Sequence, residues 1–296
     1  MSDFDINSFV KGEVDKILDK NSSQNIDTLV LSGGSLKGIA QMGALHYLER
    51  VGMLENVVTY AGTSAGSVIC AILSIGYRPS EIYHFFMNVD MSKLTKINAY
   101  NFFNKLGLDD GKRFVVVLKK YFTNKKLDPK MTFDQHHKLT MKELIITGTC
   151  VNTKKAKYFS WRSTPNMKII DALRISISVP IIYTPRKHAG QVYIDGGCID
   201  NYPIAMFSHK LERVIGIHVS ERKKEIEKID SIESFLQNTI ECLQEGMTVN
   251  AVRGHEDRTI DIVCESGEDR MRMSQMFDDG YKRAMIFCES KGYVVK

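Results

Sequence analysis

The sequence predicts a three-layer α/β/α fold with a mostly parallel central sheet. Three observations lead to this prediction. Short apolar runs alternate with helical segments, the first runs end in glycine-rich turns, and each of these turns leads directly into a helix. Strands that alternate with helices pair in parallel and have helices packed on their faces. The chain has 296 residues, 43% of them hydrophobic, which suits one main domain with a sizeable core.

Each predicted element rests on the spacing of apolar residues and on the residue that ends it. Thr28–Leu31 is an apolar run closed by Ser-Gly-Gly, which is typical of a buried parallel strand. Ile39–Val51 is predicted as a helix, with Gly52 as its C-cap. In chain order, the further predictions are a strand over Asn56–Ala61, a helix over Val68–Ile75, a mostly helical section over Pro79–Lys130, strands over Leu144–Val151, Gln191–Ile194 and Val214–Val219, a helix over Ile229–Ala251, a strand over Thr259–Cys264 and a helix over Ser274–Ser290.

Composition and charge indicate the domain organisation and the cellular compartment of the protein. We expect a charged N-terminal helix and linker over residues 1–25 and the main domain over residues 26–296. The uncharged stretch Asn56–Tyr77 has glycines and serines at its centre, which predicts a strand-to-helix corner and not a membrane span. Six cysteines without a CxxC pair, and no apolar leader in Met1–Asp15, favour a reducing, cytoplasmic setting. The net charge of +5 permits attraction to an anionic membrane and does not indicate nucleic acid.

The strongest functional signal is Gly62-Thr63-Ser64-Ala65-Gly66, between a predicted strand and a predicted helix. A Gly-x-Ser-x-Gly corner turns sharply, and its small residues leave the serine hydroxyl exposed at the edge of the sheet. The following helix directs its N-terminal amides and positive dipole end toward the same point. We therefore predict that Ser64 is a nucleophile and that Gly62 and Gly66 support its corner.

A second glycine-rich corner, Ser32–Gly38, also lies between a strand and a helix. Its amides suit an anion, either a phosphate or the oxyanion of a tetrahedral intermediate. It matches neither the Walker A pattern nor the Gly-x-Gly-x-x-Gly fingerprint. One helical crossover joins the two strands, so both corners are expected at the same edge of the sheet. This placement favours an oxyanion hole formed by Gly33, Gly34 and Ser35.

The same corner contains Lys37, followed by Gly38. Lys37 is predicted in the first turn of the helix, where a cation opposes the helix dipole. A residue that breaks a local rule near a predicted site is a candidate for function. Lys37 either raises the positive potential for an oxyanion or an anionic head group, or simply extends into solvent.

A carboxylate at another strand end, Asp195 before Gly196 and Gly197, is the candidate proton acceptor for Ser64. A serine hydroxyl needs such a partner, and burial can raise the pKa of an aspartate to suit the task. Taken alone, Asp-Gly-Gly is a common turn.

The alternative is a Ser-Asp-His triad with a histidine as the base. His209 falls in a predicted helix and His218 in an apolar strand, which leaves His255 as the histidine in a polar loop. Both the dyad and the triad therefore remain open on these grounds.

The three glycine-rich motifs, in this order, resemble those of the patatin-like phospholipases. The resemblance extends to Asp171–Arg174, Ser178–Pro180 and Asp195–Pro203, and covers roughly residues 26–290. It implies a patatin-like fold and a Ser-Asp dyad without histidine, here Ser64 and Asp195. It further implies an oxyanion hole around Gly33, Gly34 and Ser35, and hydrolysis of the acyl esters of phospholipids or other lipids, with no calcium, metal or cofactor.

The sequence departs from the commonest family pattern at two positions. Ser35 stands where a third glycine is frequent, which weakens the oxyanion assignment of its amide. Lys37 stands where an arginine is frequent, which retains the charge but loses the planar fork of donors.

Other functions remain open alternatives to a phospholipase. The chain could be a catalytically idle lipid-binding or effector module, a Ser-His-Asp esterase or an acyltransferase. A lipid substrate implies peripheral membrane contact, for which the lysines of residues 119–130 and the aromatic side chains of Tyr100, Phe102 and Phe103 are the candidates. The alternatives that involve no membrane contact are that the lysines form a solvated helix face and that the aromatic side chains pack in the core.

Overall fold

The structure of the chain is a computed structural model. It describes residues 25–88, 93–94, 98–222, 252–265, 267 and 269–293, and a few single residues between 229 and 242. The predicted N-terminal helix and linker therefore lie outside the described residues, except for Asn25. The same holds for most of the predicted helix Ile229–Ala251.

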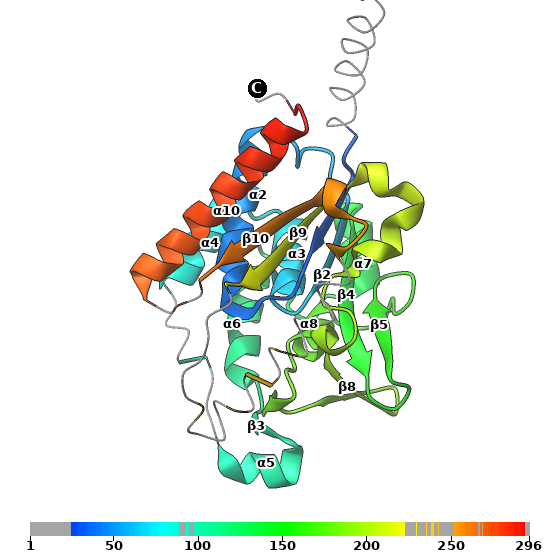
Figure 1. The fold of residues 1–296 in the computed structure, drawn as a ribbon. Coiled ribbons are helices and arrows are strands. Elements are labelled where there is room, and N and C mark those ends of the chain that lie inside the picture. Colours follow the sequence, from blue (N-terminus) through cyan, green and yellow to red (C-terminus); the bar gives the residue numbers. More distant parts are fainter. Residues whose placement is uncertain are drawn as a thin grey trace, which may run out of the picture.

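A twisted sheet forms the centre of the molecule (Figure 1). Eight strands of the described residues belong to it, in the order β10 (Thr259–Cys264), β9 (Val214–Glu221), β1 (Thr28–Leu31), β2 (Thr59–Thr63), β4 (Glu143–Cys150), β8 (Gln191–Asp195) and β7 (Arg186–His188), with β5 (Lys155–Phe159) also paired to β4. The neighbours from β10 to β4 are all parallel, whereas β5, β8 and β7 pair in antiparallel fashion. The prediction of a mostly parallel sheet is confirmed.

The helices predicted near residues 39–51, 68–75 and 274–290 are present, whereas the helices over Phe133–Thr140 and Ile169–Ser176 were not predicted. In chain order, the helices are α2 (Gly38–Arg50), α3 (Ala65–Ser74), α4 (Pro79–Asn88), α5 (Ala99–Lys105), α6 (Lys112–Asn124), α7 (Phe133–Thr140), α8 (Ile169–Ser176) and α10 (Arg270–Ser290). Short 3-10 turns are η1 (Ser35–Lys37), η3 (Gly196–Cys198), η4 (Pro203–Arg213) and η5 (Glu256–Arg258). The uncharged stretch Asn56–Tyr77 divides into β2, a corner and α3, as predicted. No helix in the described part of the chain is both long and apolar enough to cross a membrane.

Several short strands were not predicted. β3 (Gly107–Asp109) and β6 (Ile181–Tyr183) pair with each other in a small second sheet, and β5 and β7 extend the main one. These strands have three to five residues. A run this short shows no clear alternation of apolar and polar residues, so its pairing depends on the neighbouring chain.

The two faces of the sheet pack against different parts of the chain. Leu29 and Leu31 belong to the large core that includes residues of α2, α3, α8 and α10. Val30 points to the opposite face, where it belongs to a smaller core with Tyr202 and Phe207 of the η4 region. This alternation follows from the two-residue period of a strand. The burial of both faces explains why the central strands are continuous apolar runs.

Candidate active site

Strand β4 places Ser64 and Asp195 next to each other. β5 pairs with one edge of β4 along Ile146–Cys150. On the other edge, β2 ends with Thr63 opposite Thr147, and β8 begins its pairing with Asp195 opposite Gly148. Thr63, the residue before Ser64, and Asp195, the residue that ends β8, therefore lie opposite consecutive residues of one strand.

The corner at Ser64 is sharp and sterically demanding. Ser64 has φ 49° and ψ −121°, in the positive-φ region that residues with a side chain rarely adopt. A Cβ on Gly62 would lie 2.6 Å from the carbonyl carbon of Gly66, and one on Gly66 would lie 2.4 Å from the carbonyl oxygen of Ser32. Neither backbone atom can yield easily. The corner therefore requires glycine on both sides of the serine.

Asp195 is completely buried and accepts two hydrogen bonds. The Ser64 hydroxyl donates to Oδ2 of Asp195 at 2.7 Å, and the amide of Gly197 donates to Oδ1 at 2.7 Å. Burial raises the pKa of Asp195 from its ordinary value of 3.8 to about 7, and these two hydrogen bonds oppose the rise. A carboxylate with this pKa can exchange a proton with the serine near neutral pH.

Gly196 lets β8 end close to β4. A Cβ on Gly196 would lie 2.6 Å from the carbonyl oxygen of Thr147. Since Thr147 is also the partner of Thr63 in the sheet, this close approach holds Asp195 against the serine corner.

The other glycine-rich corner faces the same point, but its three amides differ. The amide of Gly33 already donates to the carbonyl of Asn201 at 2.9 Å, so it lacks the free N–H that an oxyanion hole requires. The amides of Gly34 and Ser35 make no hydrogen bond among the described residues. The amide of Ala65, at the N-terminal end of α3, is also without an acceptor among the described residues.

Gly33 is close to Ser64 for a different reason. A Cβ at Gly33 would lie 2.2 Å from Oδ1 of Asn201 and 3.3 Å from Cβ of Ser64. The glycine thus lets the two corners approach each other. Ser35 has φ 49°, a conformation that glycine adopts without strain, which accounts for the glycine that is frequent at this position.

Lys37 and Gly38 lie at the start of α2, with Lys37 in the η1 turn. Nζ of Lys37 forms an ion pair with Glu221 at 3.4 Å, at the end of β9. The lysine therefore does not simply extend into solvent; it links this corner to the neighbouring strand. A Cβ at Gly38 would meet only the flexible tip of Ile69 at 3.2 Å and Ala65 at 3.6 Å.

The loop after Asp195 holds both corners. The carbonyl of Asp200 accepts a hydrogen bond from the Thr63 hydroxyl at 2.9 Å, next to the serine. The carbonyl of Asn201 accepts the amide of Gly33. The Asp200 carboxylate in turn accepts from Tyr158 at 2.7 Å, and burial raises the pKa of Asp200. The extended aspartate motif in the sequence was the signal for these contacts.

Helix α8 and the residues just after it accept hydrogen bonds from the backbone of Ser64 and Asp195. The Ser176 hydroxyl accepts the amide of Ser64 at 2.9 Å, and the carbonyl of Ser178 accepts the amide of Asp195 at 2.9 Å. Arg174 is buried and donates to the Ser178 hydroxyl at 2.6 Å, while desolvation lowers the pKa of Arg174 to about 10. The sequence block Asp171–Arg174 resembled the family, but gave no indication of these hydrogen bonds.

An apolar pocket of about 220 Å³ opens beside Ser64. Its wall includes the two corners and side chains of α2, α3, α4, α6 and β6. The lining residues are Ser35, Leu36, Gly38, Ile39, Ser64, Ala65, Val68, Ile69, Phe86, Leu94, Phe114, Ile177, Val179 and Tyr183. A pocket of this composition suits an alkyl chain and leaves the hydroxyl at its polar wall.

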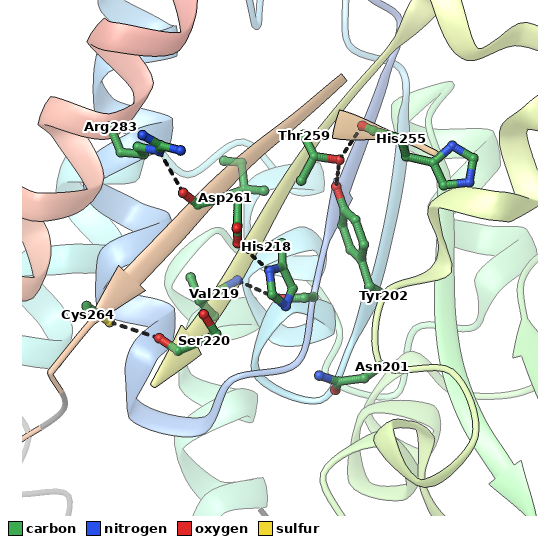
Figure 2. A network of polar contacts seen from close by, with 12 residues as sticks. Asn201, Tyr202, His218, Val219, Ser220, His255, Thr259, Asp261, Cys264 and Arg283 are labelled. Atoms are coloured by element: carbon green, nitrogen blue, oxygen red, sulfur yellow. Dashed lines mark hydrogen bonds and ion pairs between the residues drawn. The ribbon is translucent and has the colours of Figure 1, made fainter. Parts of the chain in front are cut away.

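The histidines considered for a triad lie elsewhere. His255 precedes β10, which is separated from β2 by β9 and β1, so about 14 Å of sheet lies between them. His218 contacts Asp261 at 2.6 Å and Tyr202 (Figure 2), and His209 is exposed on η4. No histidine of the described residues bonds to Ser64 or Asp195. The described residues also contain no group of three side chains placed to hold a metal ion.

Comparisons with known proteins agree with the sequence motifs. A family model described as patatin-like phospholipase matches residues 29–208. A protein named probable lipid hydrolase, from Invertebrate iridescent virus 6, is 35% identical over 180 residues, which are 60% of this chain and 61% of that protein. An uncharacterized protein of Acanthamoeba polyphaga mimivirus is 35% identical over 206 residues, 67% of each chain. The matched part thus spans less than two thirds of the first relative.

The fold is also similar to a solved structure. VipD from Legionella pneumophila superposes with a TM-score of 0.62, covering 90% of this chain and 67% of VipD at 16% sequence identity. At this identity the similarity concerns the fold alone.

Proposed function

The chain belongs to the patatin-like phospholipase family, and from this premise we propose that it is a lipid acyl hydrolase with Ser64 and Asp195 as its catalytic dyad. The observation that carries the proposal is the 2.7 Å hydrogen bond from the Ser64 hydroxyl to a fully buried carboxylate beside an apolar pocket. The proposed substrates are the acyl esters of phospholipids, whose alkyl chains match the pocket.

The first chemical step forms an acyl-enzyme. Oγ of Ser64 attacks the ester carbonyl carbon while its proton moves to Oδ2 of Asp195. The tetrahedral intermediate then collapses, the bond between the carbonyl carbon and the alkoxy oxygen breaks, and the proton on Asp195 passes to the leaving alcohol or lysolipid. The acyl group remains on Ser64 as an ester.

The second step releases the fatty acid. Asp195 takes a proton from a water molecule as that water attacks the acyl-enzyme carbonyl. When this second intermediate collapses, the proton returns to Oγ of Ser64 and the carboxylic acid leaves. The buried carboxylate thus acts as base and then as acid in each half of the cycle, and its pKa of about 7 suits both roles.

The negative charge on the substrate oxygen needs donors during both steps. We propose that the amides of Gly34, Ser35 and Ala65 supply them, since none has another acceptor among the described residues. Gly33 has a positioning role in this scheme, because its own amide is bound to Asn201. The N-terminal end of α3 adds a positive dipole at the same point.

The test compares purified wild type with Ser64→Ala and Asp195→Asn. Hydrolysis is measured on phosphatidylcholine vesicles and on p-nitrophenyl butyrate, each with and without a calcium chelator. Both variants should lower kcat/KM by about 1,000-fold or more, because members of a catalytic unit act together. His255→Ala is the matched control and should stay within about twofold.

Three outcomes would contradict the proposal. Substantial activity in either dyad variant would exclude the dyad, and a loss of several orders of magnitude in His255→Ala would favour a triad. A wild-type Ser64 that does not react with a fluorophosphonate would favour a lipid-binding module that lacks catalysis.

A further inference from the structure

Helix α5 exposes an unusual amount of apolar surface. Tyr100 is 72% exposed, Phe103 82% and Leu106 69%, and Phe102 is 39% exposed. Four large apolar side chains within seven residues therefore face solvent. An exposed apolar patch of this kind marks a surface for interaction more often than chance exposure. The structure excludes the alternative that these aromatic residues pack in the core.

Leu106 ends α5 in a backbone conformation that is strained for leucine. Leu106 has φ 58° in the left-handed region, where glycine or asparagine usually ends a helix. Its amide donates to the carbonyl of Phe102 at 3.1 Å, as the helix end requires, but its side chain extends into solvent. A leucine here is strained and gains no core packing.

Helix α5 is linked to the wall of the pocket beside Ser64 through two short strands. β3 follows α5 directly and pairs with β6, whose Tyr183 lines the pocket. The amide of Asn98, at the start of α5, donates to the carbonyl of Leu108 in β3 at 2.9 Å. Figure 1 shows α5 at the end of the molecule beyond β3, away from the main sheet. A surface that binds α5 would therefore contact the element that leads, through β3 and β6, to one wall of the pocket.

The charges around the patch are mostly positive. Lys105 lies at the end of α5, and Lys112 and Arg113 lie at the start of α6, just after β3; all three are exposed. The half-buried Asp110 pairs with Lys112 at 2.8 Å. Aromatic and aliphatic side chains bordered by lysine and arginine complement the head groups and acyl chains of an anionic phospholipid surface.

We propose that α5 and Leu106 insert into an anionic phospholipid membrane and bring the pocket to its surface, a proposal that rests on the proposed function only for the lipid's subsequent hydrolysis. Lipid binding itself does not require the dyad. The other candidate from the sequence, the lysines of residues 119–130, stays a prediction and is not part of this proposal. Lys125 pairs with Glu81 and with the carbonyl of Gly76, at the end of α6 far from α5.

The first test measures binding to vesicles in the Ser64→Ala background, so that the lipid stays intact. Vesicles of phosphatidylcholine mixed with phosphatidylglycerol are compared with vesicles of phosphatidylcholine alone. The double variant Phe103→Ser, Leu106→Ser should bind the mixed vesicles at least about tenfold more weakly, because two apolar side chains no longer enter the lipid. Unchanged binding would overturn the proposal.

Leu139→Ser is the matched control. Leu139 is 59% exposed on α7, which leads into the opposite end of β4 from the site. Binding by this variant should stay within about twofold of the parent, since α7 would not touch the membrane. An equal loss in both variants would mean that binding is not located at α5. Matching thermal midpoints would show that each variant is folded.

A second test reports insertion directly. Phe103→Trp should show a blue shift and higher fluorescence on addition of the mixed vesicles, over the constant contribution of Trp161, whereas Leu139→Trp should not. No change at position 103, or the same change at both positions, would contradict insertion of α5.

Activity then separates this proposal from the proposed function. In an otherwise wild-type chain, the double variant should lower the ratio of vesicle hydrolysis to p-nitrophenyl butyrate hydrolysis by about tenfold or more. A wild type that binds mixed vesicles but hydrolyses neither substrate would remove the proposed function and leave the membrane surface intact. A wild type that hydrolyses the soluble ester but does not bind vesicles would overturn the membrane surface and leave the proposed function intact.

Discussion

The corner at Ser64 and the helix α5 lie near the same pocket but are packed in opposite ways. At the corner, Asp195 is completely buried, and the backbone of Ser64 is held by Ser176 and by close backbone contacts at Gly66. On α5, the largest side chains face solvent and the helix is fixed mainly by its end and by β3. The Ser64 corner has almost no conformational freedom, whereas α5 has almost no tertiary packing.

The difference in packing follows from the role proposed for each region. Proton transfer between a serine and a carboxylate requires atoms that are fixed within hydrogen-bond distance. Several contacts must therefore hold that part of the site in place. Entry into a lipid surface requires apolar area that remains uncovered in water. Substitutions should therefore have large effects on stability at the corner and small effects at α5.

The largest effect on stability is expected for Gly66→Ala. Its Cβ would lie 2.4 Å from the carbonyl oxygen of Ser32 and 2.6 Å from that of Leu31, and both atoms belong to the fixed end of β1. The free energy of unfolding in urea should fall by at least about 3 kcal/mol, since backbone cannot move aside as a side chain can.

Gly38→Ala is the control for this prediction, because Gly38 also begins a helix after a strand. Its Cβ would meet only the tip of Ile69 at 3.2 Å, so the loss should stay below about 1 kcal/mol. Equal losses in the two variants would show that the Ser64 corner is no more constrained than the first one.

The next effect depends on pH and concerns Asp195. Its pKa is raised in the folded chain to about 7 from an ordinary value of 3.8, so the folded state holds this proton more tightly than the unfolded state. The stabilising contribution is therefore fully present below about pH 4 and is lost as the pH rises through 7.

Asp195→Asn removes this loss, because the amide stays neutral. The free energy of unfolding of wild type should fall relative to Asp195→Asn between about pH 4 and 8. Hydrolysis by wild type should rise over the same range, with an apparent pKa near 7, because the base must be ionised. A pH-independent difference between the two proteins, with activity already complete at pH 5, would show that Asp195 is not held at a raised pKa.

The smallest effect is expected for Ser35→Gly. Ser35 is exposed and has φ 49°, so glycine would relieve strain without loss of packing. We expect a gain of up to about 1 kcal/mol, partly offset by the greater freedom of glycine in the unfolded chain. A loss of stability, measured by the same urea titration, would show that the Ser35 side chain makes contacts that hold its corner.

Much of the fold and part of the candidate site could be predicted because their signals are local. The apolar runs of β1, β2, β4 and β9 identify buried strands without knowledge of their partners. The glycines around Ser64 report a steric requirement of the corner itself, and Asp195 was recognised by its position before two glycines. The short strands β5 to β7 were missed, because three to five residues do not establish a pattern.

Some contacts of the site join segments that are far apart in the chain. The amide of Gly33 was expected to face an oxyanion, but it is bound to Asn201 in a loop more than 160 residues away. Lys37 was left between a role in the site and simple extension into solvent; its ion pair with Glu221 excludes the second and does not test the first. The exposure of Phe103 depends on which elements cover α5, and no local pattern contains that information.

The sequence by itself therefore determined the patatin-like α/β fold, the sharp corner at Ser64 and the candidate aspartate, because glycine sterics and apolar periodicity act over a few residues. Only the tertiary structure decided that Ser64 and Asp195 are in contact. That contact depends on the register by which β2 and β8 meet consecutive residues of β4. Strand register is set by packing over the whole sheet, which no single segment specifies.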